Sequence, residues 1–262
     1  MSTTLIRRRE QDASPVATSV SEEEWDTRVN LAACYRLAAH YGLNELTYNH
    51  ISARIPGPND EILINSFGLM FEEVTASNLV KIDLEGRIVE ESPYRVNAAG
   101  FTIHSAIHAA RHDVLCVLHT HTRAGMAVSC QAQGLLPLNQ ISMQYYSRLA
   151  YHDYEGIALD RDERPRLVRD LGDKRSMILR NHGLLTAGRT IPEAFSLMFY
   201  LERACEIQIA ALAGGAELVI PPPEVCEKAA RQSEEEDGGP IGDREWAAHI
   251  RMLDREDQSY RS

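Results

Sequence analysis

Three histidines occupy positions from which their imidazoles can reach one point. His119 and His121 stand two residues apart where the apolar run 114–118 ends. Alternate strand residues point to the same face, so both rings can face one way. His182 lies in a predicted turn at 181–183, after a second apolar run. Three converging neutral imidazoles form a standard site for a divalent transition metal with a position left open. The spacing predicts this metal site, although separate surface or core histidines also fit an H-x-H motif.

A second group of histidines follows a helical repeat. His104, His108 and His112 are spaced four residues apart in a predicted helix over 98–111. Histidines at i and i+4 can bind a metal, but the isoleucines between them supply a core stripe and make a plain polar face the simpler interpretation. We interpret His104 as a group that supports the first site or transfers a proton there.

The elements that position these residues alternate between helix and strand. The patterns predict strands over 50–54, 61–65, 114–118, 176–180 and 184–187, a hairpin over 79–90, and helices over 21–41, 98–111, 123–133 and 190–213. Capping boxes are expected where Ser21 precedes Glu24 and Thr190 precedes Glu193. Residues 221–243 read as a loop, and a last short helix holds Trp246, Ile250 and Leu253.

The domain boundaries follow from this order of elements. We expect a disordered leader over 1–20, one α/β domain over 21–215, and a C-terminal loop and short helix over 216–262.

Composition narrows the class of protein. The chain has 262 residues, with 27 Lys and Arg against 38 Asp and Glu, for a net charge of −11. This balance argues against nucleic-acid or anionic-membrane binding, which require basic surface. No apolar run of about 18 residues is present, and no apolar segment follows the arginines at 7–9, so neither a membrane span nor a signal peptide is expected. Five scattered cysteines without a C-x-x-C pair indicate reduced thiols in a cytoplasmic protein.

Three motifs in order resemble the class II aldolase/adducin family. They are NAAGFTIHSAIHAAR at 97–111, VLHTHT at 117–122 and LRNHGL at 179–184, within a likeness that covers about 22–212. The run LAYHDYEGI at 149–157 resembles the adducin branch.

This resemblance implies a fold, a metal and a class of chemistry. The expected fold is a three-layer α/β/α domain with a mainly antiparallel central sheet. Zinc, or manganese or iron, would be held by the residues that match the family motifs, His119, His121 and His182. Family enzymes are often homotetramers with active sites between subunits, so residues 246–260 are expected to reach a neighbouring subunit. Their reactions include aldol cleavage, epimerisation and dehydration of small molecules.

The sequence departs from the sugar-phosphate enzymes of the family at two places. Their Ser-Ser-Glu or Ser-Ser-Asp triplet is replaced by Ala98-Ala99-Gly100, and their Gly-Asn before the first strand by Asn49-His50. A methyl group or a hydrogen atom can neither move protons nor bind phosphate. Phosphorylated-sugar chemistry in its usual form is therefore not expected.

The missing carboxylate leaves the acid/base group open. His50, His104, Tyr145 and Tyr146 are the candidates, each needing hydrogen-bond reach of the reacting atoms. For the two tyrosines, aromatic packing is the simpler interpretation.

Three functions remain open on this evidence. The first is a metal-dependent lyase for aldol cleavage or decarboxylation of a small unphosphorylated carbonyl or carboxylate substrate, with Arg54, Arg123 or Arg180 holding a carboxylate. The second is an Fe(II) oxygenase on the same scaffold, although three histidines do not match the two-His-one-carboxylate triad. The third is a non-catalytic, adducin-like oligomer. The basic tail of adducins is not expected here, because residues 234–237 are acidic.

Overall fold

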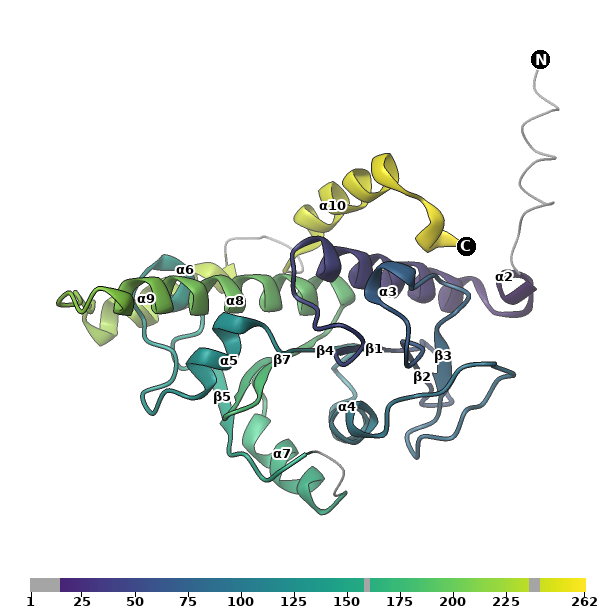
Figure 1. The fold of residues 1–262 in the computed structure, drawn as a ribbon, viewed down its shortest axis with the longest axis horizontal. Helices are drawn as coiled ribbons and strands as arrows, with labels where there is room; N and C mark the ends of the chain where they lie inside the picture. Colours follow the sequence, from purple (N-terminus) through teal and green to yellow (C-terminus); the bar gives the residue numbers. More distant parts are fainter. Residues whose placement is uncertain (1–14, 158–160, 236–240) are drawn as a thin grey trace.

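A single seven-stranded sheet forms the centre of the molecule (Figure 1). The computed structural model describes residues 15–157, 161–235 and 241–262. The strands are β1 His50–Arg54, β2 Ile62–Ile64, β3 Val80–Ile82, β4 Cys116–Thr120, β5 Leu149–His152, β6 Ser176–Leu179 and β7 Gly183–Gly188. They lie in the order β3-β2-β1-β4-β7-β6-β5, and every neighbouring pair is antiparallel except β5 with β6.

Helices cover both faces of this sheet. The helices are α2 Pro15–Ser19, α3 Glu22–His40, α4 Ala98–Ala110, α5 Arg123–Ser129, α6 Gln140–Met143, α7 Arg164–Leu171, α8 Ile191–Ala213, α9 Pro223–Glu235 and α10 Asp243–Glu256, with short 3-10 turns at η1 Phe71–Glu73, η2 Arg161–Glu163 and η3 Ser259–Arg261. Figure 1 shows α3 and α8 on one side of the sheet, α4 and α7 on the other, and α10 lying outside α3. The predicted three-layer fold with a mainly antiparallel sheet is confirmed.

Strand alternation divides the core and selects the face that carries the histidines. In β4, Cys116 and Leu118 join the apolar core beneath α3 and α8, whereas Val117 joins the core beneath α4 and α7. His119 lies on the same side as Val117 because side chains alternate along a strand. In the register of β1 with β4, His50 stands opposite His119 and Ser52 opposite Val117. His50, Ser52 and His119 therefore all face the layer of α4.

The prediction of a loop over 221–243 is wrong, because α9 occupies much of it. Pro223 stands at the first helical position, where its missing N–H costs nothing. Cys226 and Ala230, four residues apart, are buried and supply the packing face. The segment was predicted as a loop because it is rich in acidic residues, and its two buried positions are too few to give a clear helical pattern. The last predicted helix is present as α10. Residues 236–240 lie outside the described part of the chain.

Other element boundaries differ by smaller amounts. The predicted disordered leader lies outside the described residues over 1–14, and α2 stands where its end was expected. Helix α5 ends at Ser129 rather than near 133. The second arm of the predicted hairpin pairs with the first by a single bridge, Ile82 with Ile88.

The two predicted capping boxes form only in part. The Ser21 side chain accepts from the Glu24 N–H at 3.1 Å, and Thr190 accepts from the Glu193 N–H at 3.1 Å. The Glu24 carboxylate does not reach back to Ser21 but accepts from the fully buried Arg28 at 2.9 Å. A buried guanidinium requires a charge partner, and this requirement outweighs a second capping bond.

The C-terminal elements pack on their own chain. The Trp246 indole N–H donates to Asn30 Oδ1 of α3 at 2.9 Å, and Tyr260 is fully buried, its carbonyl accepting from the Ala76 N–H at 2.9 Å. The predicted contact of this region with a neighbouring subunit stays a prediction. Among the described residues, none of the helices has the length and apolar content needed to span a bilayer.

Candidate metal centre

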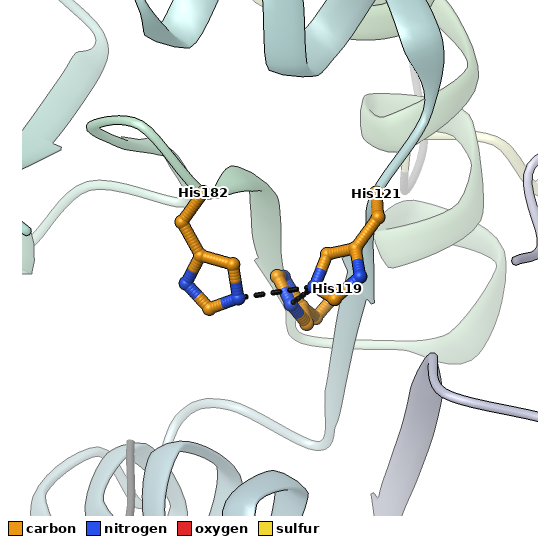
Figure 2. A group of neighbouring side chains, drawn as sticks. All are labelled: His119, His121 and His182. Atoms are coloured by element: carbon orange, nitrogen blue, oxygen red, sulfur yellow. Dashed lines mark hydrogen bonds between the residues drawn. The ribbon is translucent and has the colours of Figure 1, made fainter. Parts of the chain in front are cut away.

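The three predicted histidines converge on one point. His119 Nε2 and His121 Nε2 lie 2.8 Å apart, and His182 Nε2 lies 3.0 Å from His121 Nε2 (Figure 2). One nitrogen of each ring lies within 4.8 Å of the other two. His119 is buried, and the other two side chains are partly exposed, so the cluster opens toward solvent on one side.

The end of strand β4 and the turn between β6 and β7 position these side chains. His119 is the fourth residue of β4, and His121 follows the end of that strand. His182 belongs to the turn between β6 and β7, where Asn181 takes a left-handed φ of 56°. A Cβ at Gly183 would lie 2.3 Å from the Thr120 carbonyl oxygen, so only glycine lets this turn approach β4. The turn thereby brings His182 beside the other two rings.

Hydrogen bonds on the far side of two rings fix their orientation. His119 Nδ1 donates to the Leu184 carbonyl at 2.8 Å, which leaves the Nε2 lone pair free for a metal. His121 Nδ1 donates to Glu45 Oε2 at 2.7 Å. Carboxylate and carbonyl partners of this kind are typical of metal-binding histidines. Leu46, next to Glu45, has a left-handed φ of 47°, a strained conformation of the type found at functional sites.

Burial keeps the cluster in the form that binds metals. Burial, reinforced by the neighbouring His182 and His121, holds the pKa of His119 well below 6.5. Burial and His121 lower the pKa of His182 to about 4. Nitrogens in tetrahedral positions around zinc lie about 3.3 Å apart, a spacing that small ring shifts reach from the 2.8 and 3.0 Å observed. The donor set fits a divalent metal with an open position.

His50 borders the metal centre as a fourth imidazole. It is 5% exposed, and neither of its ring nitrogens has a hydrogen-bond partner. Burial, His121 and His182 lower the pKa of His50 to about 4. A Cβ built on Gly100 would lie 2.5 Å from His50 Cγ. The ring therefore occupies the space in which any side chain at position 100 would begin.

His104 lies one step farther from the cluster. Its ring centroid is 5.9 Å from that of His50, with the rings nearly perpendicular. Its Nδ1 lies 2.7 Å from Ser52 Oγ, and its Nε2 has no partner. The structure thus brings both predicted proton-transfer histidines to the α4 side of the metal centre.

The structure does not bring Tyr145 to the histidines. Its hydroxyl donates to the Leu197 carbonyl of α8 at 2.7 Å, and the side chain is part of the apolar core. Burial raises the pKa of this phenol well above 10. Packing explains Tyr145, and we do not retain it as a candidate acid or base. Tyr146, its neighbour in sequence, is partly buried.

Two of the three candidate carboxylate-binding arginines are engaged elsewhere. Arg54 donates to Asp60 and to the His108 carbonyl. Arg180 lies over the Tyr151 ring at 4.3 Å and donates to the Gln131 carbonyl. Arg123, the first residue of α5 and two residues beyond His121, is exposed, and its side chain has no hydrogen bond or ion pair within the described chain.

Two residues at the site escaped the sequence analysis. Glu45 lies in the loop before β1 and meets His121 across 76 residues of sequence, so no local pattern could reveal it. The half-exposed Tyr154 places its ring 6.4 Å from that of His182. Its signal was the motif at 149–157, which served only to assign the branch of the family.

Comparison with known proteins identifies the family and agrees with this fold. Residues 29–209 match the family model described as Class II Aldolase and Adducin N-terminal domain. A crystal structure of an aldolase II superfamily protein from Pseudomonas syringae is 55% identical, covers 95% of this chain and 100% of its own, and superposes with a TM-score of 0.91. The chain therefore belongs to the class II aldolase and adducin family.

Two further relatives differ in length and in name. L-fuculose 1-phosphate aldolase from Glaciozyma antarctica is 28% identical, with 92% of this chain and 93% of that chain covered and a TM-score of 0.80. Alpha-adducin of Rattus norvegicus is 44% identical over 241 residues, which make up 87% of this chain but 33% of that protein. Of these two relatives, alpha-adducin has the higher identity, but the match covers only a third of its length.

Proposed function

We propose that the protein is a divalent-metal-dependent lyase that cleaves a carbon–carbon bond beside a carbonyl group, by aldol cleavage or decarboxylation, in a small unphosphorylated substrate. The observation that carries this proposal is the convergence of three Nε2 atoms, two of them oriented by Leu184 and Glu45.

His119, His121 and His182 would hold the metal, most simply zinc. When bound there, such a metal supplies Lewis acidity that stabilises the oxyanion of an enolate. His50, with both nitrogens unpartnered at the edge of the cluster, is placed to accept or return the substrate proton. Arg123 is the arginine available to hold a substrate carboxylate.

The residues at 98–100 favour a substrate without phosphate. Gly100 lies against His50, and the two preceding residues are alanines, which offer no hydroxyl groups to a phosphate. The proposed enzyme therefore differs from the L-fuculose 1-phosphate aldolases in substrate while keeping their metal chemistry. We also propose that the protein is a homotetramer, which sedimentation would check. We place it in the cytoplasm.

Metal analysis followed by a substrate screen tests the proposal. Protein purified without chelator should contain stoichiometric zinc or manganese, and the His119→Ala/His121→Ala double variant should lose it. The loaded protein should then cleave or decarboxylate members of a panel of hydroxy-keto acids in preference to L-fuculose 1-phosphate. Stoichiometric iron would instead favour an oxygenase. No metal after reconstitution would refute the proposal and favour a non-catalytic, adducin-like role.

A further inference from the structure

A serine hydroxyl joins two buried histidines on the α4 side of the sheet. Ser52 Oγ lies 2.7 Å from His104 Nδ1 and 2.8 Å from His108 Nε2. All three side chains are fully buried. Ser52 comes from the middle of β1, and the two histidines come from successive turns of α4.

Counting hydrogens shows that this group has two equivalent arrangements. Burial, with help from neighbouring His50 and His108, holds the pKa of His104 well below 6.5, and burial with Arg54 lowers the pKa of His108 to about 3. Both rings are therefore neutral, and each carries one N–H. Ser52 has one hydrogen to donate, so one ring accepts from Oγ and the other donates to it. Either both rings carry hydrogen on Nε2 or both carry it on Nδ1.

The two outer nitrogens of the group have no hydrogen-bond partner. His104 Nε2 and His108 Nδ1 are both buried and unpaired. Buried polar atoms in native structures are almost always satisfied, by protein or by ordered water. An ordered water molecule or a neighbouring imidazole can pair with each of these atoms, so a proton can enter at one end of the group and leave at the other.

The group spans the distance between the metal centre and the far end of α4. On one side the His104 ring packs near that of His50, which borders His119 in the sheet. On the other side Arg54 donates to the His108 carbonyl and to Asp60. Asp60 also lies 3.9 Å from the ring of His112, which is 74% exposed. These contacts reach the backbone of His108 and not its ring, and they lead to an exposed imidazole and an exposed carboxylate close to the end of α4.

We propose that Ser52, His104 and His108 form a proton relay that connects the metal centre with solvent, an inference that rests on the proposed lyase function. In one transfer, His104 gives its Nε2 proton toward His50, directly or through a water molecule. Ser52 passes its proton to His104 Nδ1, and His108 passes its Nε2 proton to Ser52 Oγ. A water molecule that reaches the buried His108 Nδ1 from solvent then protonates it. Counting the outer donor and the inner acceptor, four bonds to hydrogen break and four form; one proton moves inward, and Ser52, His104 and His108 all remain neutral.

The relay gives a role to residues that the metal centre does not use. Aldol cleavage takes a proton from a substrate hydroxyl and later protonates the new carbanion, so the relay can carry one proton outward and one inward and return to its starting tautomers. Decarboxylation takes up one proton from solvent per turnover. A wholly neutral relay avoids placing a charge in a buried region, where it would be costly. Ser52, His104 and His108 are therefore positioning and relay residues and not ligands of a second metal.

Nitrogen NMR on the intact protein with 15N-labelled histidine tests the arrangement independently of activity. Long-range 1H–15N correlations, assigned with single histidine variants, distinguish the two neutral tautomers. We expect His104 and His108 to share one tautomer or to exchange together between the two. A pattern in which His104 Nδ1 and His108 Nε2 both carry hydrogen, so that Ser52 accepts twice, would overturn the relay.

An exchange assay tests proton delivery. The zinc-loaded protein is given dihydroxyacetone in D2O, and deuterium uptake beside the carbonyl is followed by NMR. Ser52→Ala should slow uptake by about 10- to 100-fold, with partial recovery in imidazole buffer. Ser129→Ala, which removes a buried hydroxyl that donates to the Met126 carbonyl, should keep the wild-type rate. A wild-type rate in folded, zinc-loaded Ser52→Ala would overturn the relay.

The two experiments separate failure of the relay from failure of the proposed function. A wild-type protein that binds zinc but exchanges no dihydroxyacetone, and cleaves nothing in the hydroxy-keto acid panel, would refute the lyase proposal. The tautomer pattern would still decide whether the Ser52 group is arranged as a relay. Should Ser52→Ala fail to fold, Ser52→Thr retains the hydroxyl and should retain the shared tautomer.

Discussion

Replacing Gly100 by alanine tests the most unusual contact of the metal centre. The new Cβ would stand 2.5 Å from His50 Cγ and 2.6 Å from Cδ2 and Cε1 of the same ring. These separations are about 1 Å shorter than ordinary carbon–carbon contact. The His50 ring must therefore move, and it has little freedom because it is 5% exposed and lies in the sheet opposite His119.

Two opposing free-energy contributions decide the size of the effect. Overpacking of a buried site costs about 1–3 kcal/mol. Alanine in a helix is favoured over glycine by up to about 1 kcal/mol. The net expectation for Gly100→Ala is a decrease in the free energy of unfolding of about 0–2 kcal/mol. Because that range includes zero, a single variant does not decide the matter.

A double-mutant cycle isolates the contact. Urea unfolding is measured for wild type, Gly100→Ala, His50→Ala and the double variant. Once His50 is truncated, the alanine at 100 should keep only its helix preference and stabilise by up to about 1 kcal/mol. The coupling free energy should therefore be about 1–3 kcal/mol. Gly214→Ala, at a position with no atom within 4 Å of the added Cβ, serves as the uncrowded control.

The result that would refute this reasoning is additivity. If the coupling is below about 0.5 kcal/mol, the two sites are independent. Gly100→Ala would then behave like Gly214→Ala, and the His50 ring would not fill the space next to position 100. The proposal that His50 stands in for the missing acidic side chain would lose its geometric basis.

Three further predictions follow from the site. Glu45→Gln should weaken zinc binding about 10- to 100-fold, measured by competition with a chromophoric chelator; unchanged affinity would show that Glu45 does not orient His121. The pKa values of His50 and His108 in the folded protein, about 4 and 3, lie below the unfolded value of 6.5. Above pH 6.5 neither residue lowers the free energy of unfolding. As the pH falls below 6.5, the unfolded chain binds protons that the folded protein does not, so the free energy of unfolding decreases. Each histidine should remove about 2.5 kcal/mol from the free energy of unfolding by pH 4.5 in urea titrations of the metal-free protein, and a flat profile would contradict their burial as neutral groups. Tyr145→Phe should cost about 1 kcal/mol of stability through the lost bond to the Leu197 carbonyl, with zinc affinity unchanged; reduced affinity would restore Tyr145 as a site residue.

Local patterns predicted most of the fold and the three converging histidines. The H-x-H spacing was sufficient for His119 and His121 because strand alternation fixes the direction of neighbouring side chains. His182 could not be assigned to the site from residue spacing, because its position depends on how closely the turn at Gly183 approaches β4. It was assigned from the family motif LRNHGL. Resemblance to the family, rather than periodicity, supplied the order of layers.

Partners distant in sequence could not be predicted in this way. Glu45 and Ser52 meet His121 and His104 through the pairing of β1 with β4 and the packing of α4 on that pair. Neither contact has a local signature. The helical ladder of His104 and His108 was visible, but the hydroxyl between them was not, because it belongs to a strand.

The contact between α3 and the C-terminal elements has a consequence for synthesis of the chain. Asn30 of α3 receives its hydrogen bond from Trp246, and Arg36 pairs with Asp257 at 3.2 Å, so each partner emerges more than 200 residues after the helix that it covers. At 5–20 residues per second, the outer face of α3 stays uncovered for on the order of 10–40 s on the ribosome. Such long-range closure also slows folding of the released chain. We therefore expect the nascent protein to depend on chaperones, and variants that loosen α10 to reduce soluble yield before they affect the metal centre.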